Sequence, residues 1–208
     1  MKRAIIDLHL EPRVYTIADF LDGPECRHMI ARAKTQEMKR ATVSGDTDGV
    51  ISDGRTNDVC WLDHADDPAC KRIALKVAGL VGVPLTHAEK FQLIRYGVGK
   101  EYKPHFDSFD PSTTSGQRNM KGGGQRIITV LGYLNKVARG GATEFPKLGI
   151  SIPLSRASCW FSTTACRVRL NGIPSRSMRA RRCLRVRNGH SICGSGLNHA
   201  TCEQRPSA

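Results

Sequence analysis

A histidine and an aspartate stand one residue apart in the tripeptide His105-Phe106-Asp107. The alternation around them predicts a strand from Tyr102 to Asp107, in which side chains two positions apart project from the same face. An imidazole nitrogen and a carboxylate oxygen on one face can bind one metal ion, and a distant second histidine would complete the facial triad that binds Fe(II). Such a triad leaves positions open for a chelating co-substrate and O₂. Because the chain contains seven histidines and twelve aspartates, the alternative is a chance surface pair.

Capped helices and short strands are predicted around this pair. Asp22 begins a helix that runs through Ala33, and Asp67 with Pro68 begins a second helix that ends near Gly82. From there the hydrophobic period changes to two, which is typical of strands. Strands are predicted at 14–20, 91–96, 102–107, 126–134, 143–145 and from 150 onward, with polar loops at 44–57 and 108–124. Two helices and many short strands predict an α+β domain, with the helices packed on a small sheet or barrel.

Four segments resemble the prolyl-4-hydroxylase-like Fe(II)/2-oxoglutarate dioxygenases of the bacterial type. Residues 93–107 read LIRYGVGKEYKPHFD and include the His-x-Asp pair. Residues 124–135 read GQRIITVLGYLN, and residues 140–146 read GGATEFP. Residues 55–57 read RTN and resemble the family's Arg-Thr-Ser loop near the substrate groove, with Asn in place of Ser. The resemblance covers the chain from about residue 14 to residue 153.

This resemblance implies a double-stranded β-helix, or jelly roll, with the N-terminal helices packed on it. It implies Fe(II), 2-oxoglutarate and O₂, with ascorbate to keep the iron reduced, and a reaction that couples decarboxylation of 2-oxoglutarate to hydroxylation of a substrate. By family position, His105 and Asp107 would bind iron and Tyr102 would line the site near the metal. Tyr96 would donate a hydrogen bond to 2-oxoglutarate, and Thr129 would lie beside it. Without the resemblance, strand packing is the simpler interpretation of Tyr96, Tyr102 and Thr129.

The downstream part of the family pattern is missing. The family has a distal histidine that completes the triad and, about ten residues later, a lysine that pairs with the far carboxylate of 2-oxoglutarate. Here no lysine follows Lys147, and His190 and His199 lack the matching surroundings. Met178 stands near the histidine position and Asn188 near the lysine position. A thioether is a poor ligand for Fe(II), and a neutral amide cannot pair with a carboxylate as a cation does.

A shifted reading frame accounts for this loss. With suitable synonymous codons, the codons of Ser177-Met178 read out of register give His, and those of Arg187-Asn188 give Lys, within one continuous motif of the family type. The sequence therefore predicts a dioxygenase domain at residues 1–153, and an Arg- and Cys-rich, frameshifted and poorly ordered tail at residues 154–208. The final strands of the jelly roll are expected to be disrupted, and the activity impaired.

The net charge of +13 suggests a non-catalytic, nucleic-acid-binding protein as an alternative. Residues 156–208 contain ten arginines, one glutamate and neither lysine nor aspartate, a net of +9, which leaves +4 for residues 1–155. Only Trp160 and Phe161 in that tail could stack on bases, which counts against this alternative. A jelly-roll binding module that has lost its metal is the third hypothesis.

Location and substrate are predicted only broadly. No apolar run reaches membrane-spanning length and no apolar signal segment follows Lys2 and Arg3, so a cytoplasmic protein is expected. The resemblance implies a peptide, protein or small-molecule substrate together with O₂.

Overall fold

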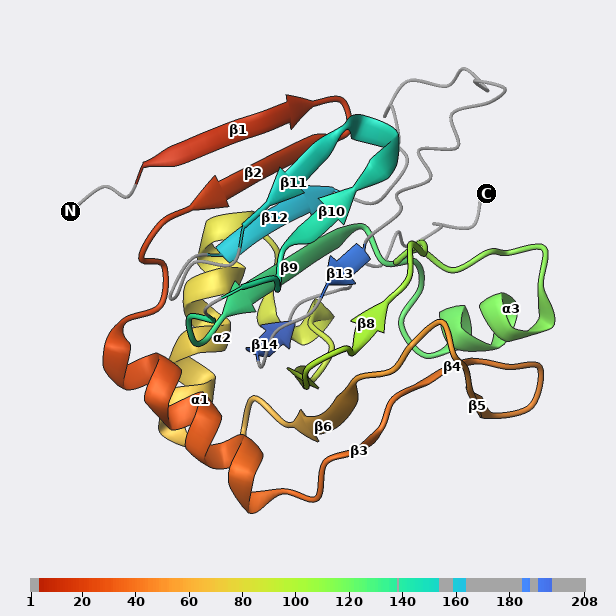
Figure 1. Cartoon of the computed structure of the whole chain (residues 1–208), viewed down its shortest axis with the longest axis horizontal. Coiled ribbons are helices and arrows are strands. Elements are labelled where there is room, and N and C mark those ends of the chain that lie inside the picture. Colours follow the sequence, from red (N-terminus) through yellow and green to blue (C-terminus); the bar gives the residue numbers. More distant parts are fainter. Residues whose placement is uncertain (1–3, 138, 154–158, 164–184, 188–190, 196–208) are drawn as a thin grey trace, which may run out of the picture.

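The computed structural model describes residues 4–137, 139–153, 159–163, 185–187 and 191–195. Its main element is an eight-stranded antiparallel sheet in the order β1-β2-β12-β9-β14-β7-β6-β3 (Figure 1). These strands are β1 (Ile5–Leu10), β2 (Arg13–Ile17), β3 (Lys39–Arg40), β6 (Asp58–Leu62), β7 (Phe91–Tyr96), β9 (Ile128–Tyr133), β12 (Cys159–Thr163) and β14 (Ser191–Ser195). A second sheet has four strands in the order β11-β10-β13-β8: β8 (Glu101–Tyr102), β10 (Thr143–Phe145), β11 (Ile150–Ile152) and β13 (Arg185–Arg187).

The remaining elements are three helices, two short helical turns and a hairpin. The hairpin pairs β4 (Thr42–Ser44) with β5 (Gly49–Ile51). The helices are α1 (Gly23–Thr35), α2 (Pro68–Val81) and α3 (Thr114–Lys121), and the 3₁₀ turns are η1 (Leu85–His87) and η2 (Pro146–Leu148). None of the helices in the described ranges has the length and apolarity needed to cross a bilayer.

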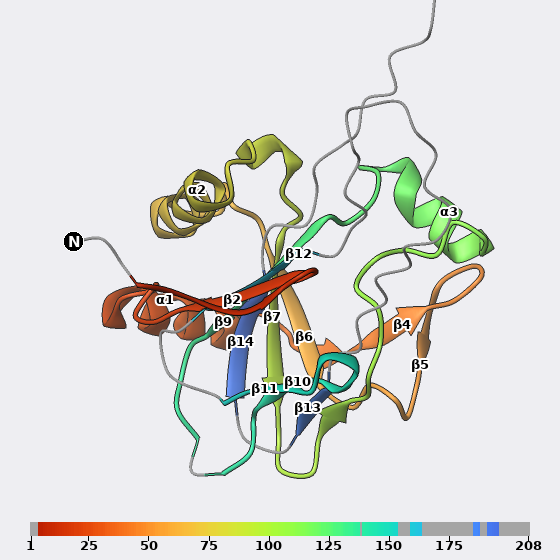
Figure 2. The ribbon, with the colours of Figure 1, turned by 90° about the horizontal axis from the view of Figure 1, so that it is seen from above.

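The central strands of the eight-stranded sheet are buried on both faces, whereas the edge strand β1 is largely exposed. Helices α1 and α2 cover one face, and the four-stranded sheet lies on the other (Figure 2). Strand β7 shows how the period of two divides its side chains. Phe91 and Leu93 pack in the cluster that contains the helices, whereas Ile94 and Tyr96 pack with Phe145 of the second sheet. The α+β class predicted from the sequence is therefore confirmed, because the helices gather on one face of antiparallel sheets.

The predicted helix starts are also found. Asp22 is the N-cap of α1, and with Glu25 it forms a reciprocal capping box. Asp67 is the N-cap of α2, where its side chain accepts a hydrogen bond from the amide of Cys70. Helix α2 ends at Gly82, whose φ of 70° is in the left-handed region that favours glycine. Local capping residues thus set the positions of both helices.

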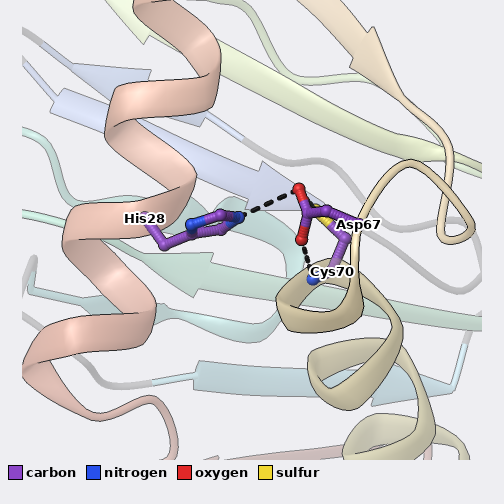
Figure 3. A group of neighbouring side chains, drawn as sticks. All are labelled: His28, Asp67 and Cys70. Atoms are coloured by element: carbon purple, nitrogen blue, oxygen red, sulfur yellow. Dashed lines mark hydrogen bonds and ion pairs between the residues drawn. The ribbon is translucent and has the colours of Figure 1, made fainter.

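A polar contact joins the two helices at their buried side (Figure 3). His28 of α1 approaches Asp67 with 3.0 Å between Nε2 and Oδ2, and the thiol of Cys70 donates to the same oxygen at 3.4 Å. Arg32 Nε lies 3.2 Å from that oxygen and balances its charge. Burial, assisted by the Asp67 carboxylate, raises the pKa of the Cys70 thiol to about 12. His28, Asp67 and Cys70 are residue types that can bind a metal ion. The charge and hydrogen bonds of Asp67 are already matched, however, so we interpret the group as a link between helices.

The segments after residue 153 require a correction. The sequence predicts that the final strands are disrupted, yet β12 pairs with both β2 and β9, β14 with β7 and β9, and β13 with β8 and β10. Strand pairing uses backbone N–H and C=O groups, which do not depend on the side-chain pattern. The tail's separate origin stays a prediction, and Met178 and Asn188 lie outside the described residues.

Removal of the Asp67 charge should make the free energy of unfolding depend less on pH in the acid range. Burial raises the pKa of Asp67, but hydrogen bonds from the Cys70 amide, His28 and the Cys70 thiol outweigh it and lower the pKa from 3.8 to about 2. A depressed folded-state pKa contributes stability above about pH 4 that is lost as the pH falls toward 2. Asp67→Asn keeps an N-cap acceptor, so it should cost about 1 kcal/mol near neutral pH, and this difference should shrink in acid.

Urea unfolding at a series of pH values from 6 down to about 2.5 measures this difference in the free energy of unfolding. Asp48→Asn, in the exposed turn of the hairpin, is the control for the loss of one negative charge. A difference between wild type and Asp67→Asn that stays constant across this range would contradict the assignment of the charge to the helix link.

Candidate metal and co-substrate site

A cavity of about 630 Å³ opens beside the two sheets. All five residues predicted for the site line it: Tyr96, Tyr102, His105, Asp107 and Thr129. Strands β7, β8 and β9 supply Tyr96, Tyr102 and Thr129. The structure therefore brings together, from three strands and one loop, residues that the sequence predicted to lie on three strands.

His105 and Asp107 approach each other as predicted, but from a loop. His105 Nε2 lies 3.3 Å from Asp107 Oδ1, whereas strand β8 ends at Tyr102. The predicted strand from Tyr102 to Asp107 is therefore wrong beyond its first residue. Pro104, which has no backbone N–H to give to a sheet, lies at the start of the loop. The adjacency of the two side chains comes from the folded loop rather than from a shared strand face.

The backbone orients the imidazole of His105. Its Nδ1 lies 2.9 Å from the carbonyl oxygen of Lys103. Since a carbonyl only accepts hydrogen bonds, Nδ1 carries the proton in this contact. The other ring nitrogen, Nε2, faces Asp107 and is the one that could bind a metal. Hydrogen bonding of one ring nitrogen to fix the tautomer is typical of metal-binding histidines.

Tyr102 stacks on His105. Their ring centroids are 3.6 Å apart and their planes differ by 14°. Arg55 also contacts Tyr102, with its guanidinium carbon 4.6 Å from the ring centroid. Burial raises the pKa of the Tyr102 hydroxyl, an effect that Arg55 opposes, so the phenol stays protonated near neutral pH. The ring thus holds one face of the imidazole and excludes water from it.

The carboxyl group of Asp107 is held in its charged form. Burial raises its pKa, but the hydrogen bond with His105 and the charge of that ring outweigh burial and leave the pKa below its ordinary value. Thr129 and Arg126 act in the same direction. The Thr129 hydroxyl is buried beside this carboxyl group. A carboxylate, an imidazole and a buried hydroxyl together fit a metal ion and a polar co-substrate.

Tyr96 also fits a role in packing. Its side chain is almost fully buried and belongs to the apolar cluster between the sheets, where Leu131 and Phe145 are neighbours. The same residue lines the cavity. Both interpretations drawn from the sequence therefore remain compatible with its position.

Two features of the site were not predicted from the sequence. Arg126, two residues before β9, forms a bidentate pair with Glu89, with Nε–Oε1 and Nη2–Oε2 distances of 2.6 and 2.9 Å. Gln125 binds both backbone groups of Phe109, each at 2.8 Å. Gln125 and Arg126 belong to a segment that carries the family resemblance, but their partners lie 16 and 37 residues away. No local pattern in the sequence reveals such pairings.

A third feature that was not predicted joins two elements that line the cavity. Helix α3 lies against the β4–β5 hairpin (Figures 1 and 2). Arg118 of α3 donates hydrogen bonds to the carbonyl oxygens of Gly45, Asp46 and Thr47 at 2.6–2.9 Å. Asn119 adds a bond of 3.1 Å to the Ser44 hydroxyl. Residues of both elements line the cavity, so these bonds hold one part of its wall together.

A model of the 2OG-Fe(II) oxygenase superfamily matches residues 91–201, more than half of the chain. This chain belongs to that superfamily. Probable prolyl 4-hydroxylase 10 of Arabidopsis thaliana is 35% identical over 138 residues, which are 65% of this chain and 46% of the relative. This chain thus spans about half the length of the curated relatives it matches.

Solved structures of this superfamily share the fold. The viral collagen prolyl hydroxylase of Paramecium Bursaria Chlorella virus-1, in a 2OG complex, superposes with a TM-score of 0.66 at 20% identity, over 90% of this chain and 96% of that one. A Pseudomonas putida prolyl-4-hydroxylase gives 0.61 at 15% identity, over 90% and 93%. A Trichoplax adhaerens prolyl hydroxylase in complex with a hypoxia inducible factor peptide fragment gives 0.63 at 15%, over 89% and 83%. The predicted jelly roll is therefore confirmed, as is the resemblance to prolyl 4-hydroxylases.

A third metal ligand is not found near the pair. Within the part of the chain that the structure describes, no third histidine, cysteine or carboxylate groups with His105 and Asp107. The position where the oxygenase family has its distal histidine falls near Met178, outside the described residues. His105 and Asp107 are therefore two candidate ligands that lie together, and the loss of the third ligand stays a prediction about the tail.

Removal of His105 should abolish binding of a divalent metal in the cavity. Cobalt(II), an optical probe for Fe(II) sites, is expected to bind the wild-type chain and to lose at least tenfold in affinity in His105→Ala, because one of two protein ligands is gone. His9→Ala is the matched control, since His9 lies on β1 with its ring bound to the Pro12 carbonyl. Equal titration curves for His105→Ala and His9→Ala would show that the metal binds elsewhere.

Proposed function

We propose that this chain is built as a hydroxylase of prolyl residues in peptides, with His105 and Asp107 as its iron ligands. The observation that carries the proposal is the approach of His105 Nε2 to the ionised Asp107 carboxylate at 3.3 Å, inside a cavity that Tyr96 and Thr129 also line. The superfamily is defined by Fe(II) and 2-oxoglutarate, and these groups fit the nitrogen and oxygen donors present.

Each residue has a part in this proposal. When bound, Fe(II) with 2-oxoglutarate and O₂ supplies oxidative decarboxylation coupled to hydroxylation, and ascorbate keeps the metal reduced. His105 offers Nε2, because Nδ1 is bound to Lys103. Asp107 supplies negative charge, and Tyr102 shields the imidazole. Tyr96 and Thr129 would bind the co-substrate through their hydroxyl groups.

The character of the cavity supports a peptide substrate. Trp61 and Phe106 line it and are partly exposed, at 48% and 37%, and Tyr102 stands between Arg55 and His105. Aromatic surfaces of this kind bind prolyl rings in other proline-recognising grooves. The Trichoplax adhaerens prolyl hydroxylase was solved with a peptide fragment, which agrees with this substrate class.

We also propose that the activity of this chain is impaired. The family histidine and lysine have Met178 and Asn188 near their positions. Loss of one metal ligand weakens the site, and loss of the cation removes the partner of the far carboxylate of 2-oxoglutarate. The alternative of a nucleic-acid-binding tail has no support from the described residues.

A comparison of two proteins tests the function and the impairment together. The chain as given is expected to decarboxylate 2-oxoglutarate at least a hundredfold more slowly than a version whose frame is corrected between the codons of Pro153 and Ser158. The assay follows succinate formation with and without Fe(II) and a proline-rich peptide. Robust iron-dependent turnover by the chain as given would refute the impairment, and no turnover by either protein would refute the function.

A further inference from the structure

The loop that carries the two candidate metal ligands is held by side chains from outside it. Beyond Tyr102 the loop leaves the sheet, so the sheet does not fix the distance from Asp107 to Thr129 on β9. Arg126 Nη1 donates a hydrogen bond to the backbone carbonyl oxygen of Asp107 at 3.3 Å. The arginine that starts the β9 segment therefore touches the main chain of a candidate ligand.

We infer that Arg126, oriented by Glu89, is a positioning residue that holds the Asp107 loop against β9 in register with the metal site. The inference rests on the proposed function for the meaning of that site.

Three contacts fix the guanidinium in this place. The bidentate pair with Glu89 sets its plane, because two parallel N–H···O bonds allow only one orientation. The ring of Phe109 lies under it, with the guanidinium carbon 4.5 Å from the ring centroid. Both side chains of the ion pair are largely buried, at 26% and 16% exposed. A guanidinium held in this way can bind a carbonyl at low entropic cost.

The neighbouring residue holds the same loop independently. Gln125 accepts from the backbone N–H of Phe109 and donates to its carbonyl oxygen, each at 2.8 Å. Gln125 and Arg126 thus bind the loop at Phe109 and Asp107, two residues apart. One end of β9 therefore acts as a clamp on the segment that follows His105, and Glu89 supplies the charge that keeps the clamp in place.

Metal affinity and local exchange test this role. Arg126→Gln and Glu89→Gln are expected to weaken cobalt(II) binding by about tenfold, as loss of a group that orients a ligand commonly does. Amide hydrogen exchange at residues 105–109 should become faster in both variants. Arg126→Lys keeps the positive charge but loses the planar pair of guanidinium donors. The cobalt(II) affinity of this variant should therefore lie between those of the wild type and Arg126→Gln. The double variant should be no weaker than Arg126→Gln, because Glu89 acts through Arg126.

Arg95→Gln is the matched control. Arg95 forms an ion pair with Asp58 at 2.9 Å on β7, but both side chains are more exposed and neither lines the cavity. This variant should leave cobalt(II) affinity and loop exchange unchanged. If Arg126→Gln behaves like Arg95→Gln in both measurements, the positioning role is refuted.

The proposed function can fail separately. If the wild-type chain binds no cobalt(II), the metal site itself is wrong. Hydrogen exchange at residues 105–109 still decides whether Arg126 and Glu89 hold the loop, since that measurement requires no metal.

Discussion

Burial of both faces of the eight-stranded sheet is the constraint on which the rest of this structure depends. Central strands β7 and β9 have apolar side chains on both sides, so neither face can remain in water. Helices α1 and α2 cover one face. The other is only partly filled by the small four-stranded sheet, and the space left over is the cavity. The candidate site is thus a region of incomplete packing between two sheets, where polar side chains such as Thr129 and Asp107 are buried together.

The electrostatics of the site follow from that burial. A carboxylate such as Asp107 would be neutral in an apolar cavity unless other groups compensated for the loss of water. Here the imidazole of His105 and the nearby Arg126 supply this compensation, and the charge survives. Glu89 in turn balances Arg126. Each of these charges lowers the free-energy cost of burying its neighbour. The charge on Asp107 is the one that remains available to a cation.

Local patterns predicted the parts of the fold that depend on local chemistry. Asp22 and Asp67 are helix caps because a side-chain oxygen three residues before an amide can satisfy it. Strands β7 and β9 were recognisable as largely apolar segments because both of their faces are buried. The proximity of His105 and Asp107 was also predicted, although for the wrong reason: the loop after Pro104, rather than a strand, brings them together. Helix α3 was missed because nearly all of its residues are polar and Met120 alone makes no apolar period; only Thr113 as N-cap and the buried Gly116 distinguish it from a loop. Arg126 and Glu89 could not be paired from the sequence, because long-range contacts of this kind leave no periodic signal.

The contact between α3 and the β4–β5 hairpin in the cavity wall depends on a cation that binds neutral oxygens. Arg118 binds three backbone carbonyls of the β4–β5 hairpin rather than a carboxylate, so the bonds are of the ion–dipole kind. Dissolved salt screens pairs of exposed charges over about 10 Å, but it weakens short ion–dipole bonds much less. This part of the cavity wall should therefore loosen with rising temperature far more than with rising ionic strength.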